Sequence, residues 1–162
     1  MNFVIERGVL TKFRPALFQK EVIVPENVIF IGDKAFKGCT HLKKVVLPKN
    51  LIGISNYAFS GCESLEEINI PKCTNSIGSF AFQGCSSLKT IEILGNTGIC
   101  ANAFEASGLQ CLKLSEHATF FGGRPMVSCS DLDAVFYAGD NGKVFEINRE
   151  TLDNAHLKWW EV

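Results

Sequence analysis

Seven cysteines are the residues of this 162-residue chain with the widest range of possible chemistry. Cysteine thiolates bind zinc, form disulfides and act as nucleophiles. Cys39, Cys62 and Cys85 each follow an Ala-Phe-x-Gly sequence at an interval of 23 residues, and Cys129 recovers the same register further on. No two cysteines form a Cys-x-x-Cys motif, no histidine stands at ligand spacing, and the odd total argues against a disulfide framework. We therefore expect these four to be buried structural thiols, with Cα separations too long for disulfides.

The other residues that could act chemically form no recognisable catalytic or cofactor-binding group. His41, His117 and His156 lie at unrelated positions of the pattern, and His41 is expected at the surface. The chain contains no serine nucleophile elbow, no His-Glu-x-x-His motif and no phosphate-binding glycine loop. The backbone amides of residues 122–124 (Gly-Gly-Arg) could bind an anion, but a turn between repeats explains them better. The sequence thus predicts no catalytic residue, no metal site and no cofactor, and the protein is not expected to be an enzyme.

The cysteines belong to a longer repeat. Ala-Phe pairs at 35–36, 58–59 and 81–82 each precede a leucine seven residues after the alanine and then a short strand pattern, at 45–47, 68–70 and 91–93. Prolines at 25, 48 and 71 end successive strands. A fourth unit begins at Ala103-Phe104, with Ala106 in the cysteine position, and a degenerate fifth unit has Pro125-Met126 in place of Ala-Phe. Many independent positions share one register, so the repeat is not a chance pattern.

This period predicts a solenoid, because neither a short strand nor a single helical turn can bury its apolar side alone. Stacked copies pair their strands in parallel, about 4.8 Å apart, and align the phenylalanines of the Ala-Phe pairs in a buried column. We predict an α/β solenoid of about five to six coils of roughly 23 residues, with short parallel strands on one face and a cap at each end. One domain would cover residues 1–162: an N-terminal cap at 1–20, repeats at 21–137 and a C-terminal cap at 138–162.

Both ends depart from the repeat, as the ends of a solenoid must. The apolar runs at 3–5 and 9–10, separated by Glu6-Arg7-Gly8, predict a hairpin cap. Asp140-Asn141-Gly142 predicts a turn before a strand at 144–147. A short helix is expected at 148–157, followed by a tryptophan pair, Trp159-Trp160, that seals the final coil.

Composition excludes several classes of function. The formal net charge is −1 and the lysines and arginines form no cluster, so the sequence does not indicate a nucleic-acid partner. Its apolar runs fall far short of the roughly 18 residues of a membrane span, so membrane insertion is not expected. The N-terminus lacks a basic stretch followed by a long apolar one, which is the pattern of a signal peptide. The compartment is therefore open, with the cytoplasm favoured over the cell surface.

The repeat Ile-Gly-x-x-Ala-Phe-x-Gly-Cys-x-x-Leu-x-x-Val-x-Leu-Pro, found at 31–48, resembles the BspA-like class of leucine-rich repeats. The opening residues 3–12 also look like the segment that often precedes such arrays, and the resemblance extends to about residue 137. It implies a leucine-rich repeat protein of bacterial type, from a family in which many members lie at the cell surface and some are linked to adhesion or protein binding. It implies no catalytic residues.

The alternation of strand residues selects one candidate binding surface. It places on the outer face of the strands Lys44, Val46, Glu67, Asn69, Thr90, Glu92, Cys111, Lys113, Ala134 and Phe136. Lys44 is expected to face Glu67 and Glu92 to face Lys113 across adjacent strands, and Cys111 is the one cysteine expected on this face. Two interpretations are open: the charges serve only solubility, or the face binds a protein of unknown identity with Phe136 as its apolar anchor. The alternative is a structural, spacer or self-associating repeat segment of a bacterial cell-surface or adhesion-type protein.

Overall fold

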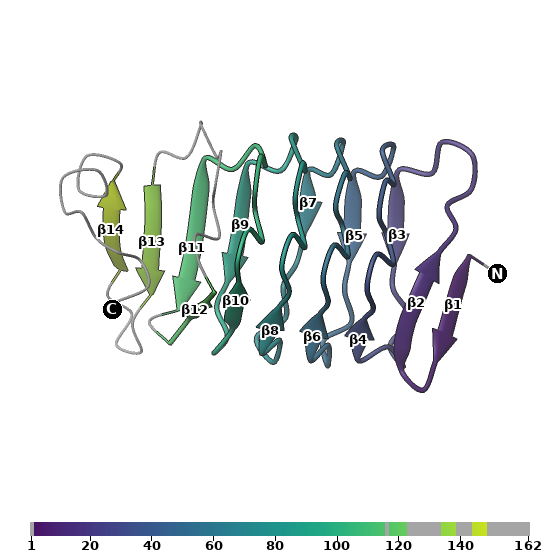
Figure 1. Ribbon diagram of the computed structural model, residues 1–162, viewed down its shortest axis with the longest axis horizontal. Coiled ribbons are helices and arrows are strands. Elements are labelled where there is room, and N and C mark those ends of the chain that lie inside the picture. The colour runs from purple at the N-terminus through teal and green to yellow at the C-terminus, as the bar shows by residue number, and fades with distance from the viewer. Residues whose placement is uncertain (1, 116, 123–133, 139–143, 149–162) are drawn as a thin grey trace.

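The computed structural model describes residues 2–115 and 117–122 and the strands at 134–138 and 144–148. Across these residues the chain winds as a solenoid whose coils stack along the long axis of the molecule (Figure 1). Strands on two sides of each coil pair in parallel with the corresponding strands of the neighbouring coils. The predicted repeat therefore forms a solenoid, and each of its two long faces is built from strands of successive coils.

One side of the solenoid carries the strands that the sequence predicted. They are β3 (Glu21–Ile23), β5 (Lys44–Val46), β7 (Glu67–Ile68), β9 (Thr90–Ile93), β11 (Cys111–Ser115) and β13 (Ala134–Ala138). We call the outward side of these strands the strand face. The strands pair in parallel from β3 to β7 and from β9 to β13, with Lys44 opposite Glu67 and Cys111 opposite Thr90.

The opposite side carries a second sheet that the sequence analysis did not foresee. It is continuous and contains β1 (Phe3–Glu6), β2 (Val9–Phe13), β4 (Phe30–Ile31), β6 (Gly53–Ile54), β8 (Ser76–Ile77), β10 (Gly98–Cys100) and β12 (Thr119–Phe121). The prediction of strands on one face only was therefore wrong. The repeated isoleucines at 31, 54 and 77 sit in these strands and are buried.

The α part of the predicted α/β class was also wrong, because the described residues contain no helix. The Ala-Phe segments are turns in which alternate amides donate to the next coil: Phe36 N–H to Ala58 O at 2.8 Å and Gly38 N–H to Ser60 O at 2.9 Å. The intervening amides close four-residue turns, such as Cys39 N–H to Phe36 O at 3.1 Å. Each segment also contains a residue with positive φ before the alanine, such as Lys34 at 59°, which a helix does not tolerate. Half of the donors that a helix needs are thus used between coils.

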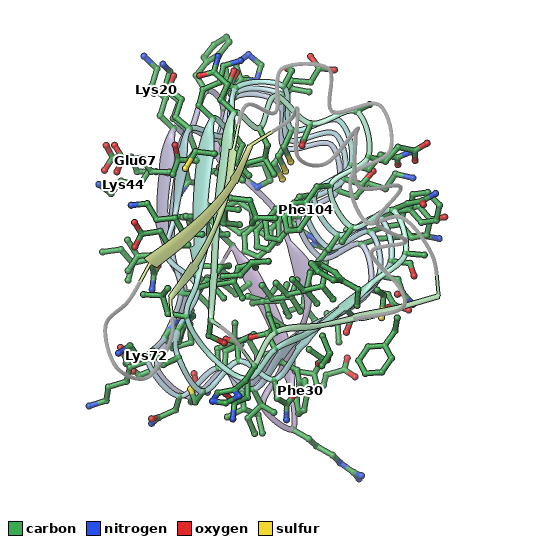
Figure 2. All side chains as sticks on the ribbon, turned by 90° about the vertical axis from the view of Figure 1, so that its left-hand side faces the viewer. Lys20, Phe30, Lys44, Glu67, Lys72 and Phe104 are labelled. Atoms are coloured by element: carbon green, nitrogen blue, oxygen red, sulfur yellow. The ribbon has the colours of Figure 1, made fainter. Side chains whose placement is uncertain are left out.

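The core is a column of stacked phenylalanines flanked by aliphatic side chains. Phe36, Phe59, Phe82 and Phe104 are fully buried, and their neighbouring ring centroids lie 4.8, 5.3 and 5.5 Å apart with nearly parallel planes. Phe13 extends the column at 4.9 Å from Phe36. Figure 2 shows Phe104 in the interior of the coil. The predicted aromatic column is confirmed, and it fixes the stacking of coils at distances typical of favourable aromatic pairs.

The predicted burial of the repeat cysteines is confirmed for Cys39, Cys62 and Cys85, whereas Cys129 lies outside the described residues. The thiols of Cys62 and Cys85 donate to carbonyl oxygens of the preceding coil, Phe36 O at 3.1 Å and Phe59 O at 3.2 Å. Burial raises the pKa of Cys85 to about 12. The hydrogen bond with Cys39 and then burial raise the pKa of Cys62. These thiols therefore stay protonated near neutral pH.

In the fourth coil the cysteine position is taken by Ser107, and the assignment of Ala106 to it was wrong. Ala106 has φ of 50°, matching the positive φ of the glycine that precedes each repeat cysteine. Ser107 is buried, and its N–H donates to Phe104 O at 3.1 Å as that of Cys85 donates to Phe82 O at 3.2 Å. The prediction placed the deletion of the fourth unit before the cysteine position, whereas the structure places it after Ser107.

The caps agree with the prediction where they are described. β1 and β2 form an antiparallel hairpin whose turn includes Arg7 and Gly8, both with positive φ. β14 (Val144–Asn148) pairs antiparallel with β13, so the strand predicted at 144–147 is confirmed. The turn at 140–142, the helix at 148–157 and the tryptophan pair lie outside the described residues.

Candidate partner-binding face

The predicted surface residues lie on the strand face. Two rows run across the strands: Lys44, Glu67, Thr90 and Cys111 form one, and Val46, Asn69, Glu92 and Lys113 form the other. None of these eight is buried, and Figure 2 shows Lys44 and Glu67 pointing outward. Ala134 and Phe136 continue the rows in backbone register, opposite Cys111 and Lys113, and their side chains lie outside the described part of the chain.

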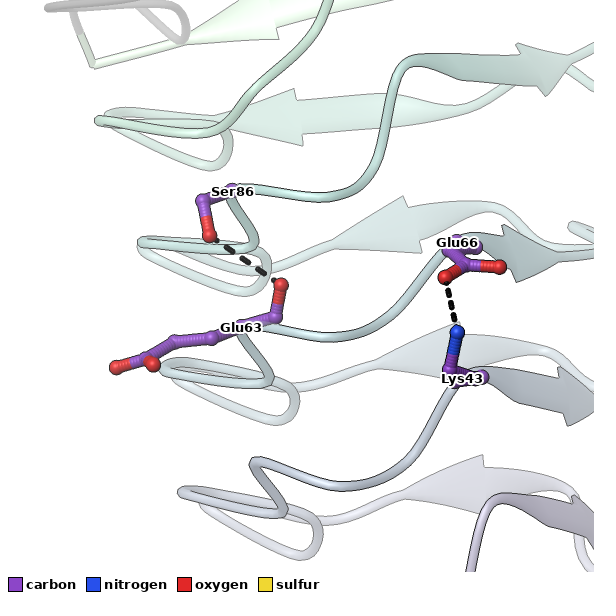
Figure 3. Close-up of polar contacts among 4 residues, drawn as sticks. All are labelled: Lys43, Glu63, Glu66 and Ser86. Carbon is purple, nitrogen blue, oxygen red and sulfur yellow. Dashed lines mark hydrogen bonds and ion pairs between the residues drawn. The ribbon is translucent and has the colours of Figure 1, made fainter.

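Ion pairs between neighbouring coils neutralise much of this face. Lys44 Nζ lies 2.5 Å from Glu67 Oε2, and Lys113 Nζ lies 2.5 Å from Glu92 Oε1, so both predicted cross-strand pairs are confirmed. The hydrogen bond and charge of Glu67 raise the pKa of Lys44, and Glu92 does the same for Lys113. A third pair, Lys43 with Glu66 at 2.6 Å, was not predicted (Figure 3). Exposed pairs contribute only about 0–1 kcal/mol each, so they organise the surface more than they stabilise it.

The strand face is interrupted between β7 and β9. β3, β5 and β7 form one sheet and β9, β11, β13 and β14 another, and no hydrogen-bonded ladder joins the two across the described residues. The opposite sheet continues through the same coils, because β8 pairs with β10. The interruption is therefore local to the candidate binding face.

Asn69 shortens β7 on the side of the preceding coil. Its side-chain amide turns toward the preceding coil, where Oδ1 accepts a hydrogen bond from Leu47 N–H at 2.7 Å and Nδ2 donates to Leu47 O at 3.1 Å. In the first coil the same role falls to main-chain atoms, since Val24 N–H donates to Val46 O. A side chain that replaces the main chain in the ladder shortens β7 to two residues.

The interruption exposes part of the core. In the other described coils the inward residues of these strands are at most 5% exposed, as with Val22, Val45 and Ile91. Ile68 and Ile70 of the third coil are only partly buried. An apolar strip that is covered in every neighbouring coil is thus open to solvent at β7.

The opening is closed at both of its ends. At one end the hydroxyl of Ser86 donates to Glu63 O at 3.2 Å, as Figure 3 shows, and Ser87 N–H donates to the same oxygen at 3.1 Å. At the other end a Cβ on Gly95 would lie 2.3 Å from Lys72 O, so only glycine permits this approach of the coils. Between them lies a shallow depression of about 540 Å³, lined by Lys44, Val45, Val46, Glu66, Glu67, Ile68, Asn69, Lys89 and Thr90. We call it the β7–β9 hollow.

Cys111 lies on the strand face as predicted and is half-buried there. Cys73, which the sequence did not single out, is exposed in the turn after β7, and its thiol donates to Lys49 O at 2.9 Å. Cys73 occupies no repeat position, which is the only sequence feature that distinguishes it from the buried set. Within the described ranges, no three His, Cys, Asp or Glu residues are grouped to hold a metal ion. The same ranges include no helix of the length and apolarity that crossing a membrane requires.

Comparison with known proteins places this geometry in a recognised class. Residues 12–133 match the sequence profile described as BspA type leucine rich repeat region, in six copies. A leucine-rich repeat protein from Bacteroides ovatus is 30% identical, with a TM-score of 0.71 over 83% of this chain and 38% of its own. The leucine-rich repeat protein of T. pallidum is 26% identical, with a TM-score of 0.71 over 78% of this chain and 62% of its own.

The pneumococcal vaccine antigen PcpA shares the fold at 18% identity, with a TM-score of 0.71 over 85% of this chain and 35% of its own. The chain thus spans less than two thirds of the length of each of these three solved structures. A search of the curated proteins finds no match to it.

Proposed function

Because the chain belongs to the BspA-type leucine-rich repeat family, we propose that it is a non-catalytic interaction module whose strand face binds a protein partner. Repeat solenoids offer extended surfaces on which many side chains lie in fixed register. On the strand face, we expect the binding energy to be concentrated at one place.

The observation that carries the proposal is the β7–β9 hollow. Interfaces concentrate their energy in partly enclosed apolar spots ringed by polar groups. Here Ile68 supplies apolar surface, with Ile70 next in the same strand segment, and the Lys44–Glu67 and Lys43–Glu66 pairs form the rim. A partner that places an apolar side chain in the hollow removes this surface from water, at about 25 cal/mol per Å².

The ion pairs around the hollow contribute to specificity. Each lysine already has a carboxylate neighbour, so a partner gains little by bringing one charge of either sign. A partner whose positive and negative side chains alternate can replace these ion pairs with pairs across the interface. A partner whose charges do not match leaves like charges opposite each other. The face therefore favours a mixed-charge protein surface over a uniformly acidic or basic polymer.

The test compares two double variants of matched size and charge. Val46→Arg with Thr90→Arg places two guanidinium groups over the hollow, at positions that face solvent. Asn75→Arg with Thr119→Arg adds the same groups at exposed positions beside the opposite sheet. Wild type and both variants are immobilised and exposed to lysate and culture medium of the source organism, after their thermal midpoints are shown to agree.

A protein that wild type and the Asn75/Thr119 variant retain, and that the Val46/Thr90 variant loses, supports binding at the hollow. Its direct affinity for the three purified proteins must then follow the same order. Equal retention by all three overturns the assignment to the strand face. Retention of this chain alone would instead support the self-associating alternative.

A further inference from the structure

The loop between β2 and β3, residues 14–20, forms a second surface with a different character. It leaves the hairpin at the N-terminal end of the solenoid and leads into the first strand of the strand face (Figure 1). At its centre Leu17 is 86% exposed and Phe18 is 64% exposed. These two adjacent apolar side chains are among the most exposed of the described residues. We call residues 14–20 the cap loop.

Hydrogen bonds fix the shape of the cap loop. Gln19 Oε1 accepts from Asn2 Nδ2 at 3.1 Å and from Ala16 N–H at 3.0 Å, while Gln19 Nε2 donates to Glu21 O at 3.0 Å. Gln19 N–H also donates to Ala16 O at 3.0 Å. A loop tied at these points holds its apolar side chains in place before any partner arrives, which lowers the entropy that binding must overcome.

Phe18 combines an exposed ring with a left-handed backbone conformation. Its φ is +59°, a value that bulky residues rarely adopt. Strain of this kind persists where the surrounding structure enforces it and is common at functional sites. The ring meets His41 edge-on, with centroids 5.3 Å apart, and beside them lies a small pocket of about 80 Å³ lined in part by Pro15, Ala16 and Leu42. The loop thus offers both a projecting apolar pair and a recess.

The cap loop itself is positively charged. Residues 14–20 contain Arg14 and Lys20 and no acidic residue, Lys12 stands just before them in β2, and Glu21 follows in β3. Lys12, Arg14 and Lys20 have no ion pair with any residue in the described ranges. The strand-face lysines Lys43, Lys44 and Lys113 differ, because each is paired with a glutamate. Exposed apolar surface and unpaired positive charge therefore coincide at this end of the molecule.

We propose that the cap loop is a docking site for an acidic segment of a protein partner that carries an apolar side chain. The carboxylates of that segment would pair with Arg14 and Lys20, and its apolar side chain would cover Leu17 and Phe18. A lipid surface fits less well, because anionic membranes are typically bound by four to eight clustered cations (a general range for such motifs). This inference is independent of the proposed strand-face function, since it uses none of the residues that line the β7–β9 hollow.

The experiment uses a displayed library of short random peptides, selected on the whole chain. We expect the recovered peptides to be rich in aspartate and glutamate around at least one leucine, isoleucine or phenylalanine. Their affinity should fall steeply with added salt, because exposed charges are screened. The Leu17→Ser/Phe18→Ser variant and the Arg14→Glu/Lys20→Glu variant should each weaken binding roughly tenfold or more. The Val46→Arg/Thr90→Arg variant serves as the control and should bind like wild type.

Three outcomes would overturn the proposal. The selected peptides could be uncharged or basic, or they could bind the two cap-loop variants as well as wild type. The third outcome is that no peptide is enriched while wild type sediments with vesicles of equal parts phosphatidylserine and phosphatidylcholine, which would assign the loop to a membrane surface. Circular dichroism of each variant confirms that its fold is intact.

Discussion

The side-chain amide of Asn69 makes both of its hydrogen bonds to the main chain of Leu47, at 2.7 and 3.1 Å, in the preceding coil. This contact ends the ladder between β5 and β7 after two residues. One side chain thus takes the place of the main chain at the end of that ladder.

Replacement of Asn69 separates its structural role from its effect on the surface. Asn69→Val should let the main chain of β7 pair with Leu47, as the valine at the equivalent position of β5 does with the first coil, and should protect the Leu47 amide. Asn69→Ala leaves the buried Leu47 amide without its acceptor and should cost about 1–3 kcal/mol in the free energy of unfolding. Urea unfolding and amide hydrogen exchange measure both effects. Equal destabilisation by the two variants would contradict the view that the Asn69 side chain replaces the main chain in the ladder between β5 and β7.

The phenylalanine column predicts a large and local stability effect. Phe82→Ala removes a fully buried ring from between Phe59 and Phe104 and should reduce the free energy of unfolding by about 3–5 kcal/mol. Phe121→Ala, at a ring that is 58% exposed, is the matched control and should cost less than about 1 kcal/mol. Chemical denaturation gives both values. Similar losses for the two variants would mean that the column does not dominate the core.

The buried thiol of Cys85 predicts a stability that falls in alkali. Its pKa is about 12 in the folded chain against 9.0 for an ordinary thiol, so between these values the folded state holds a proton that the unfolded state releases. The contribution of this thiol to the free energy of unfolding is therefore fully present below pH 9.0. It is lost as the pH rises toward 12, at about 1.4 kcal/mol per pH unit. Urea midpoints measured from pH 7 to pH 10.5 should show a steeper decline for wild type than for Cys85→Ala. Parallel declines would mean that the Cys85 thiol is not the group responsible.

The Lys44–Glu67 pair should matter little for stability and more for the pattern of charge. Lys44→Glu places two carboxylates opposite each other and should cost at most about 1 kcal/mol, with a smaller cost at high salt. The double variant Lys44→Glu/Glu67→Lys should recover that loss. A double-mutant cycle at two salt concentrations measures the coupling. A coupling well above that range would show that the pair is a structural element of the solenoid.

The sequence predicted the phenylalanine column and the strand face, but it missed the second sheet, the hydrogen bonding of the turns and the β7–β9 hollow. The spacing of Phe36, Phe59 and Phe82 was enough to predict the column, because stacked coils bring equivalent residues together. Helix was predicted for the Ala-Phe turns because nothing local in residues 35–39 reveals that their amides bond to the next coil. The β7–β9 hollow was missed because residues 68–70 carry the same strand pattern as the other repeats. Eight of the predicted strand-face residues lie on that face, whereas the side chains of Ala134 and Phe136 lie outside the described part of the chain, and a role of the face in binding stays a prediction.

The division of the strand face also has a mechanical consequence. At the junctions from β3 to β7 and from β9 to β11, a pull along the solenoid axis is resisted by strand ladders on both sides of the coil. Between β7 and β9 the strand side contributes no ladder, so the load falls on the opposite sheet, the stacked rings and the turn bonds to Glu63. Among the junctions from β3 to β11, this level has the lowest tensile strength. A stretched chain should therefore bend open toward the strand face there before any other coil separates, with β8 and β10 acting as the pivot.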